Sequence, residues 1–305
     1  MILVTGATGH FGGKAVEALL AMAPARQLAV SVRVPEKASA LQVRGVDVRR
    51  GDFDDPASLN AAFSGVDRLL IVSTDGDDDT RIRQHIAAVA AAKAKGVGFL
   101  AYTSIANADT TPLSLGDVHR ATERAIRATG IPFCFLRNNW YIENETPVFQ
   151  GVLAGAPIAT SAADGRVGWA AREDYAQAAA AVLAGQGHDN AIYELSGPPI
   201  TYGDLAAILS RILGHDVPVR RVNDAAFEDI MSEAGLPEFV VSLLVDIHRS
   251  IRKGALDVRS DDLGRLLGRP VTALNDVVER IVKGLPPPPE EARSASPENA
   301  PHPHA

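Results

Sequence analysis

The chain has 305 residues, a formal net charge of −7 and a pI near 5.6. This length suits one large domain or two modest ones, and the acidic balance argues against a nucleic-acid partner held through phosphate contacts. With Cys134 as the single cysteine, no disulfide can form within the chain, and no apolar stretch reaches membrane-spanning length. The N-terminus enters a strand pattern without a basic region or a cleavage site. We therefore expect a cytoplasmic protein that binds neither nucleic acid nor membrane.

Short apolar runs alternate with longer helix-like segments along most of the chain. The runs are too short for helices, and several are rich in Val and Ile, as buried parallel strands are. This alternation predicts an α/β fold with a Rossmann-type, doubly wound parallel sheet that helices cover on both faces. The expected strands are 2–5, 28–32, 46–48, 69–73, 99–104, 133–137 and 192–195, and the expected helices are 12–22, 56–63, 80–95, 117–129 and 172–183. In helix 80–95, Ile82, Ile86, Val89 and Ala90 have the 3–4 residue spacing of an amphipathic helix, which predicts its apolar face.

Three glycines follow the first expected strand directly. The chain begins MILVTGATGHFGG, so Gly6, Gly9 and Gly12 have the spacing G-x-x-G-x-x-G. Glycines between a strand and a helix let the backbone turn tightly and approach a pyrophosphate, which the start of the next helix attracts. This spacing, rather than G-x-G-x-x-G, is typical of short-chain and extended dehydrogenase-type proteins. We predict a dinucleotide site at this turn.

The end of the second strand favours NADP(H) over NAD(H). An acid there would bind both ribose hydroxyls and repel a 2′-phosphate, but the text LAVSVRVPEKA has no acid before Glu36. Arg33 stands about 20 residues beyond Gly12, where that acid is expected, and a guanidinium suits a phosphate. Asp52, after the third strand, either contacts the adenine amino group or caps the helix that begins near Pro56.

The organisation of the chain follows from these elements. Residues 1–140 form the NADP(H)-binding Rossmann domain, and residues 170–197 return to it. Residues 141–169 and 198–285, in which short segments are broken by Gly and Pro, form a smaller C-terminal α/β lobe on the substrate side. Residues 286–305 have too few apolar side chains to offset the entropy cost of ordering the chain by burial, so we expect a disordered tail.

The chain resembles the NmrA-like, atypical short-chain dehydrogenase/reductase family and, within it, the bacterial NAD(P)H:quinone oxidoreductases of type 2. The resemblance is carried by ILVTGATGHFG, SVRVPEKA, GDFDDPASL, YTSIANADTTPL, LRNNWYIEN, AAREDYAQAAAAVL, YELSG and LGRPVTAL, nearly the whole chain. It implies hydride transfer from NADPH to a quinone in the cleft between the two lobes. The cofactor contacts that it implies are Gly6, Thr8, Gly9, His10, Phe11, Arg33, Ser73, Asn138, Trp140, Tyr141 and Arg172, and Gly12 joins them on the glycine spacing.

The place of the usual Tyr-x-x-x-Lys motif of short-chain dehydrogenases holds different residues. His119 stands for the Tyr and Glu123 for the Lys, so the phenol and ammonium that protonate an alcohol oxygen are absent. Ordinary alcohol dehydrogenation is therefore disfavoured. His119 and Glu123 lie four residues apart on one helix face, so the carboxylate either holds the imidazole protonated or forms a surface ion pair with it.

Two main functions remain open from the sequence, besides a third in which an isomerase or reductase of another small aromatic substrate uses the same cleft. In the first, a quinone-like acceptor takes hydride with little acid help because the charge spreads over its ring, and positioning supplies most of the catalysis. The catalytic candidates are Asn138, Trp140, Tyr141 and His119, with Tyr102 and Ser104 as further donors. In the second, the chain binds NADP(H) without turnover and acts as a redox sensor.

The remaining predictions concern partners and Cys134. We predict that the chain has no metal site and that it can form a homodimer. Cys134 lies inside the expected strand 133–137, so we interpret it as a buried small apolar residue rather than a nucleophile.

Overall fold

A seven-stranded sheet forms the centre of the first of two structural units, and all its strand pairs are parallel. Its order is β3-β2-β1-β4-β5-β6-β8, so the connections reverse direction beside β1, where such folds bind ligands. This confirms the Rossmann-type fold predicted from the sequence. The strands are β1 (Ile2–Thr5), β2 (Leu28–Val32), β3 (Asp47–Arg50), β4 (Arg68–Ile71), β5 (Phe99–Ile105), β6 (Phe133–Asn138) and β8 (Ala191–Leu195).

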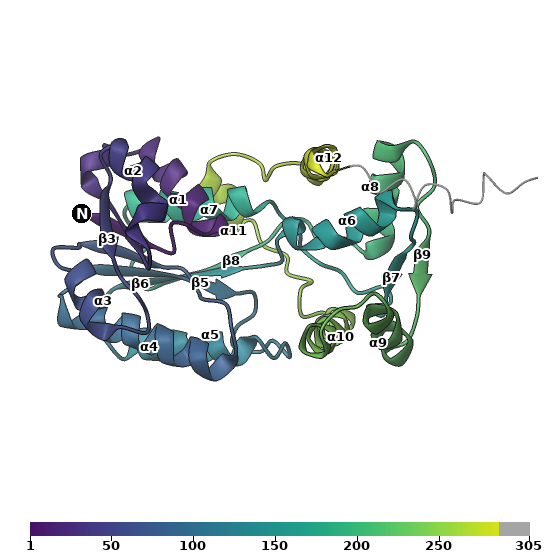
Figure 1. Ribbon diagram of the computed structural model, residues 1–305, viewed down its shortest axis with the longest axis horizontal. Helices are drawn as coiled ribbons and strands as arrows, with labels where there is room; N and C mark the ends of the chain where they lie inside the picture. The colour runs from purple at the N-terminus through teal and green to yellow at the C-terminus, as the bar shows by residue number, and fades with distance from the viewer. Residues whose placement is uncertain (287–305) are drawn as a thin grey trace, which may run out of the picture. The chain divides into compact units, whose positions relative to one another are not determined.

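Helices cover both faces of this sheet (Figure 1). One face carries α1 (His10–Leu20), α7 (Arg172–Ala184) and α11 (Asp262–Leu267), and the other carries α3 (Pro56–Ala62), α4 (Asp78–Ala94) and α5 (Gly116–Arg127). The short η1 (Ala25–Gln27), η2 (Pro35–Ala38) and α2 (Ser39–Val43) complete the unit. Strand side chains such as Leu3, Leu69 and Leu100 are fully buried between the layers, as continuous apolar strands require.

The buried face of α4 differs from the predicted one. Val89 is buried, but Ile86 is 46 % exposed, and the helix instead buries Arg81 and His85. These polar side chains are tolerated inside because they are bonded: Arg81 Nε donates to the Thr74 carbonyl at 2.7 Å, and His85 bonds on both ring nitrogens. Hydrophobic spacing could not reveal this, because the residues that pack against α4 determine which of its faces is buried.

The structure, a computed structural model, describes residues 1–286, and the second unit holds Trp140–Ala171, Pro198–Asp257 and the described residues from Thr272. The predicted tail, apart from Pro286, lies outside the described residues. The unit comprises η3 (Ile142–Glu145), α6 (Thr146–Leu153), α8 (Tyr202–Leu213), α9 (Asp224–Glu233), α10 (Glu238–Arg252) and α12 (Leu274–Gly284). Two short strands, β7 (Ile158–Thr160) and β9 (Val219–Arg221), pair in parallel, which the sequence did not predict.

Residues Val258–Val271 belong to the first unit, although we placed them in the smaller lobe. Two contacts explain the assignment. Asp262 at the start of α11 accepts the backbone N–H of Glu194 at 3.0 Å, and Arg269 donates to Asp174 of α7 at 2.7 Å. Across residues 1–286 we find no helix with the length and apolarity to cross a membrane.

Candidate functional site

The glycine turn joins β1 to α1 at the carboxyl edge of the sheet. Gly6 has φ +64°, a conformation that favours glycine, and its N–H donates to the Ser31 carbonyl at 3.1 Å. A Cβ at Gly12 would collide with the backbone of Gly6, so Gly12 allows the helix to approach the strand. Gly9 is exposed, has negative φ and forms the N-cap of α1 without a side-chain cap, and a Cβ there would lie 3.2 Å from the Gly6 carbonyl oxygen. Gly6 and Gly12 therefore shape the turn, while Gly9 keeps its outer surface open.

The start of α1 suits an anion. A helix begins with backbone N–H groups that its own turns cannot satisfy, and it carries a positive dipole end. Thr8, Gly9 and His10 are exposed there, whereas the ring of Phe11 is only 7 % exposed. A ligand at this helix start would therefore meet the backbone of Phe11 rather than its ring. These residues fit a dinucleotide pyrophosphate.

Arg33 follows the carboxyl end of β2 and is exposed. Among residues 1–286 its guanidinium has neither a hydrogen-bond partner nor an ion-pair partner, although Asp54 lies near enough to feel its charge. Asp54 is itself bonded to Arg83, at 2.6 Å. The capping role considered for Asp52 is wrong, because Asp55 accepts the Ser58 N–H as the cap of α3. Arg33 thus remains available for a phosphate.

The neighbouring strand ends are fixed by threonines. The Val72 N–H donates to Thr5 Oγ1 and the Ser73 N–H donates to Thr103 Oγ1, each at 2.9 Å, so the exit of β4 is pinned from β1 and from β5. Asn138 ends β6 and is 4 % exposed. The carboxyl edge of the sheet therefore carries the glycine turn, Arg33, Ser73 and Asn138 together.

The other predicted contact residues are distributed over both units. Arg172 is the first residue of α7 in the first unit. Trp140 and Tyr141 open the second unit and are partly buried, and the Trp140 carbonyl accepts the Ala170 N–H at 3.3 Å. The structure thus places Trp140 and Tyr141 in a different unit from the glycine turn.

His119 and Glu123 do not pair with each other. Both are buried, which excludes the surface ion pair, and the Glu123 carboxylate instead accepts from Arg137 at 2.7 and 3.0 Å and from Ser104 at 2.6 Å. His119 Nδ1 bonds the Tyr102 hydroxyl at 2.8 Å. Burial, with the charge of Arg81 next, lowers the pKa of His119 well below its ordinary value. The expectation that Glu123 holds the imidazole protonated is therefore wrong, because β6 supplies a competing cation.

A second histidine, His85, lies beside the same tyrosine. Its Nε2 accepts the Thr74 N–H at 2.9 Å, so the ring proton is on Nδ1, which bonds Thr122 Oγ1 at 2.9 Å. Burial lowers the pKa of His85 to about 3, so the ring is neutral. His85 was missed from the sequence because nothing in its spacing distinguishes it from a surface histidine. Cys134 is buried as predicted, and burial raises the pKa of its thiol to about 12.

Comparison with known proteins decides the family. The sequence profile of the NmrA-like family matches residues 1–253. The chain belongs to the NmrA-like family. The resemblance predicted from its motifs is thereby confirmed. This NmrA-like chain is 39 % identical over 282 residues to Quinone oxidoreductase 2 of Escherichia coli (strain K12), covering 92 % of this chain and 98 % of that protein.

Solved structures agree with this placement. The Escherichia coli NADPH-dependent quinone oxidoreductase complexed with NADPH has a TM-score of 0.89 at 39 % identity. The Citrobacter sp. triphenylmethane reductase complexed with NADP(H) has a TM-score of 0.87 at 41 % identity. Each likeness covers 92 % of this NmrA-like chain and 99 % of the other. Both of these relatives were therefore crystallised with the cofactor that Arg33 and the glycine turn predict here.

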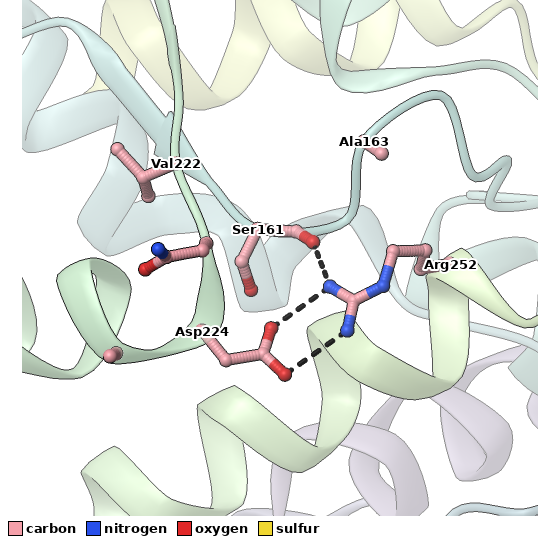
Figure 2. A pocket seen from close by; sticks show the side chains of 7 residues that line it. Ser161, Ala163, Val222, Asp224 and Arg252 are labelled. Atoms are coloured by element: carbon pink, nitrogen blue, oxygen red, sulfur yellow. Dashed lines mark hydrogen bonds and ion pairs between the residues drawn. The ribbon is translucent and has the colours of Figure 1, made fainter.

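The second unit of this NmrA-like chain contains a hollow of about 580 Å³, and Figure 2 shows it from close by. It is lined by Ser161, Ala163, Val222, Asn223, Asp224, Ala225 and Arg252. Arg252 donates to both carboxylate oxygens of Asp224, at 2.9 and 3.0 Å, and to the Ser161 carbonyl. The hydrogen bonds from Arg252 hold the pKa of Asp224 well below its ordinary value. The two opposite charges of the hollow thus neutralise each other, and we assign it no ligand.

The side chains that commonly bind metals are dispersed in the part of the chain that the structure describes. Within residues 1–286, no group of three or more His, Cys, Asp or Glu side chains is arranged to hold a metal ion.

Proposed function

We propose that this NmrA-like chain is an NADPH-dependent oxidoreductase that transfers hydride to a quinone or a similar small aromatic acceptor. The observation that carries the proposal is the exposed, unpaired Arg33 after β2, beside a glycine turn that opens a helix. Bound NADPH supplies the hydride. The protein supplies the pyrophosphate site at α1 and the 2′-phosphate contact at Arg33.

The acceptor class is argued from the relatives and from the site. One relative is a quinone oxidoreductase and another is a triphenylmethane reductase. Quinones and triphenylmethane dyes share a conjugated system that spreads the charge of the reaction, so neither depends on a strong acid. This suits a chain in which His119 is buried and neutral. We propose Asn138, Trp140 and Tyr141 as the residues that orient the cofactor and the acceptor.

The decisive measurement mixes purified protein with NADPH and a benzoquinone and follows the absorbance of the reduced nicotinamide. We expect turnover, and a triphenylmethane dye and an azo dye in parallel define the acceptor class. Tight NADPH binding with no turnover of any acceptor would contradict the proposed enzymatic activity and favour a redox sensor. The absence of the Tyr-x-x-x-Lys pair is the observation that supports a sensor. A cytoplasmic location and a homodimer remain predictions.

The cofactor choice is tested by Arg33→Ala. We expect NADPH binding to weaken by about 1.5–3 kcal/mol, the value of a hydrogen bond to a charged group, and NADH binding to change little. Titration calorimetry with both cofactors measures this. Arg26→Ala is the matched control, because Arg26 is also exposed but precedes β2 instead of following it. An equal loss for NADPH and NADH would show that Arg33 does not contact the 2′-phosphate.

A further inference from the structure

One carboxylate in the second unit is surrounded by neutral hydrogen-bond donors. Glu145, at the end of η3, is 5 % exposed. Trp169 Nε1 donates to its Oε1 at 3.2 Å, and the Tyr202 hydroxyl lies 3.4 and 3.5 Å from its two oxygens. The side chain of Trp140 donates a third hydrogen bond to the same carboxylate. Both tryptophans of the chain therefore bond to one acid.

A histidine fixes the direction of these hydrogen bonds. The Ser161 N–H donates to His248 Nδ1 at 3.2 Å, so the ring proton is on Nε2, which lies 3.4 Å from the Tyr202 hydroxyl. That hydroxyl accepts from His248 and has its own proton left for Glu145. The His248 ring is stacked on Tyr202 and on Phe227, with centroids 5.2 and 4.2 Å apart. The backbone at Ser161 thus orients a chain of donors that ends on Glu145.

Among the described residues no cation pairs with Glu145. Within residues 1–286 it forms no ion pair, and the causes that shift its pKa are burial and the three donors. Burial raises the pKa of Glu145 to about 7 and lowers that of His248 to about 4, so His248 is neutral in the same range. The nearest charged groups along the network are Asp224 and Arg252, which act on His248 and pair with each other.

We propose that Glu145 is a positioning residue that holds the indole of Trp140 in a fixed orientation by accepting its N–H. The contribution of this ring to acceptor binding rests on the proposed function, but the ring's attachment to Glu145 does not. A neutral amide could satisfy both indoles without the cost of a buried charge. A carboxylate provides a stronger, charge-assisted bond to the Trp140 N–H when it is ionised.

The attachment is tested by fluorescence, without any substrate. Trp169→Phe leaves Trp140 as the sole tryptophan. We expect its emission to change with pH around a midpoint above the wild-type pKa of about 7, because Trp169→Phe removes a donor that lowers the pKa of Glu145, and to be flat over the same range after Glu145→Gln is added. Glu143→Gln, in the same η3, is the matched control and should retain the titration. The same emission maximum and the same pH profile with and without the added Glu145→Gln substitution would overturn the attachment.

If Trp169→Phe does not fold, the same titration is read from both tryptophans by comparing wild type with Glu145→Gln. The pH-dependent emission change should then be present in the first protein and absent in the second. Its persistence in Glu145→Gln would overturn the attachment equally.

The catalytic consequence is measured separately. In Glu145→Gln we expect the KM for the acceptor to rise five- to tenfold and kcat to change less than twofold. The Kd of NADPH should rise by no more than the KM does, because Trp140 is also a proposed cofactor contact. An unaltered KM together with a positive fluorescence result would show that Trp140 is held by Glu145 but does not orient the acceptor. If wild type turns over no acceptor, the proposed function fails while the fluorescence result still decides the attachment.

Discussion

The two units each bury a glutamate, and the two carboxylates have opposite surroundings. Glu123 in the first unit is 4 % exposed and lies against the Arg137 guanidinium. Glu145 in the second unit is 5 % exposed, and its hydrogen-bond donors within residues 1–286 are neutral. Burial is therefore nearly equal, and the presence of a cation is what distinguishes them.

This difference separates two uses of a buried acid. Burial alone would lower the pKa of Arg137, but hydrogen bonds to Glu123 and Asp109 raise it above its ordinary value, so Arg137 stays charged and its bonds to Glu123 hold α5 to β6. Glu145 has no such partner, so its charge changes near neutral pH. The first unit thus uses its acid as a fixed structural element, and its ligand site is made from backbone and from the exposed Arg33. In the second unit, the strength of the hydrogen bond between Glu145 and the Trp140 indole changes with the charge of Glu145.

The largest effect is expected when the cation of the first pair is removed. Arg137→Met leaves Glu123 buried without compensation, and we expect a loss of about 3–5 kcal/mol in the free energy of unfolding. Urea denaturation followed by circular dichroism measures it. Adding Glu123→Gln should recover part of the loss, because the fully buried carboxylate is then replaced by a neutral amide. Recovery stays partial because Glu194 and Asp109, which also pair with Arg137, still lack that cation. A loss below about 1 kcal/mol would mean that the two acids do not differ as we describe.

The second prediction tests whether the ligand site of the first unit is independent of its buried pair. Gly9→Val should weaken NADPH at least about a hundredfold, or about 3 kcal/mol, because the side chain occupies the open surface of the turn. The melting temperature should fall much less than in Gly12→Val, since Gly9 has negative φ and is exposed and its Cβ would lie 3.2 Å from the Gly6 carbonyl oxygen, against 2.3 Å for Gly12. Gly12→Val is the contrasting variant and should not fold, because its side chain meets the Gly6 backbone. Normal NADPH binding by Gly9→Val would place the phosphate site elsewhere.

The third prediction concerns the neutral histidine beside the first pair. His119→Ala should lower turnover less than about tenfold, or about 1.4 kcal/mol of barrier, because a neutral imidazole bonded to Tyr102 is a poor acid. Stopped-flow kinetics with a quinone, alongside Tyr102→Phe, measures this. A loss near a thousandfold with NADPH affinity intact would instead make His119 the proton donor.

The smallest effect is the pH dependence contributed by Glu145. Its pKa is about 7 folded against an ordinary 4.5, so the folded state binds more protons between these values, and stability falls as pH rises through this window. From pH 6 to 8 we expect wild type to lose about 1 kcal/mol relative to Glu145→Gln, and the difference should be constant at higher pH. Urea unfolding of both proteins at each pH measures it. Parallel curves would show that Glu145 does not titrate in this range.

Much of the first unit was predictable from the sequence. Its strands are uninterrupted apolar runs, and the glycine spacing indicates a tight turn independently of the residues that pack around it. β1, β2, β6 and the turn before α1 were therefore correctly predicted. The second unit was less predictable, because β7 and β9 are short strands that pair across a long stretch of chain. Glu145 could not be singled out, since its donors Trp169 and Tyr202 lie far from it in the sequence.

The sequence by itself determined the alternation of strand and helix, the glycine turn and the absence of an acid after β2, since each is a local property of neighbouring residues. Only the tertiary structure decided which partner each buried polar side chain has. Helical spacing placed His119 and Glu123 on one face, but Arg137 from β6 took the carboxylate and Tyr102 from β5 took the imidazole. The physical reason is that the charge of a buried group is set by the groups within hydrogen-bond distance, and in this fold those come from other strands and helices.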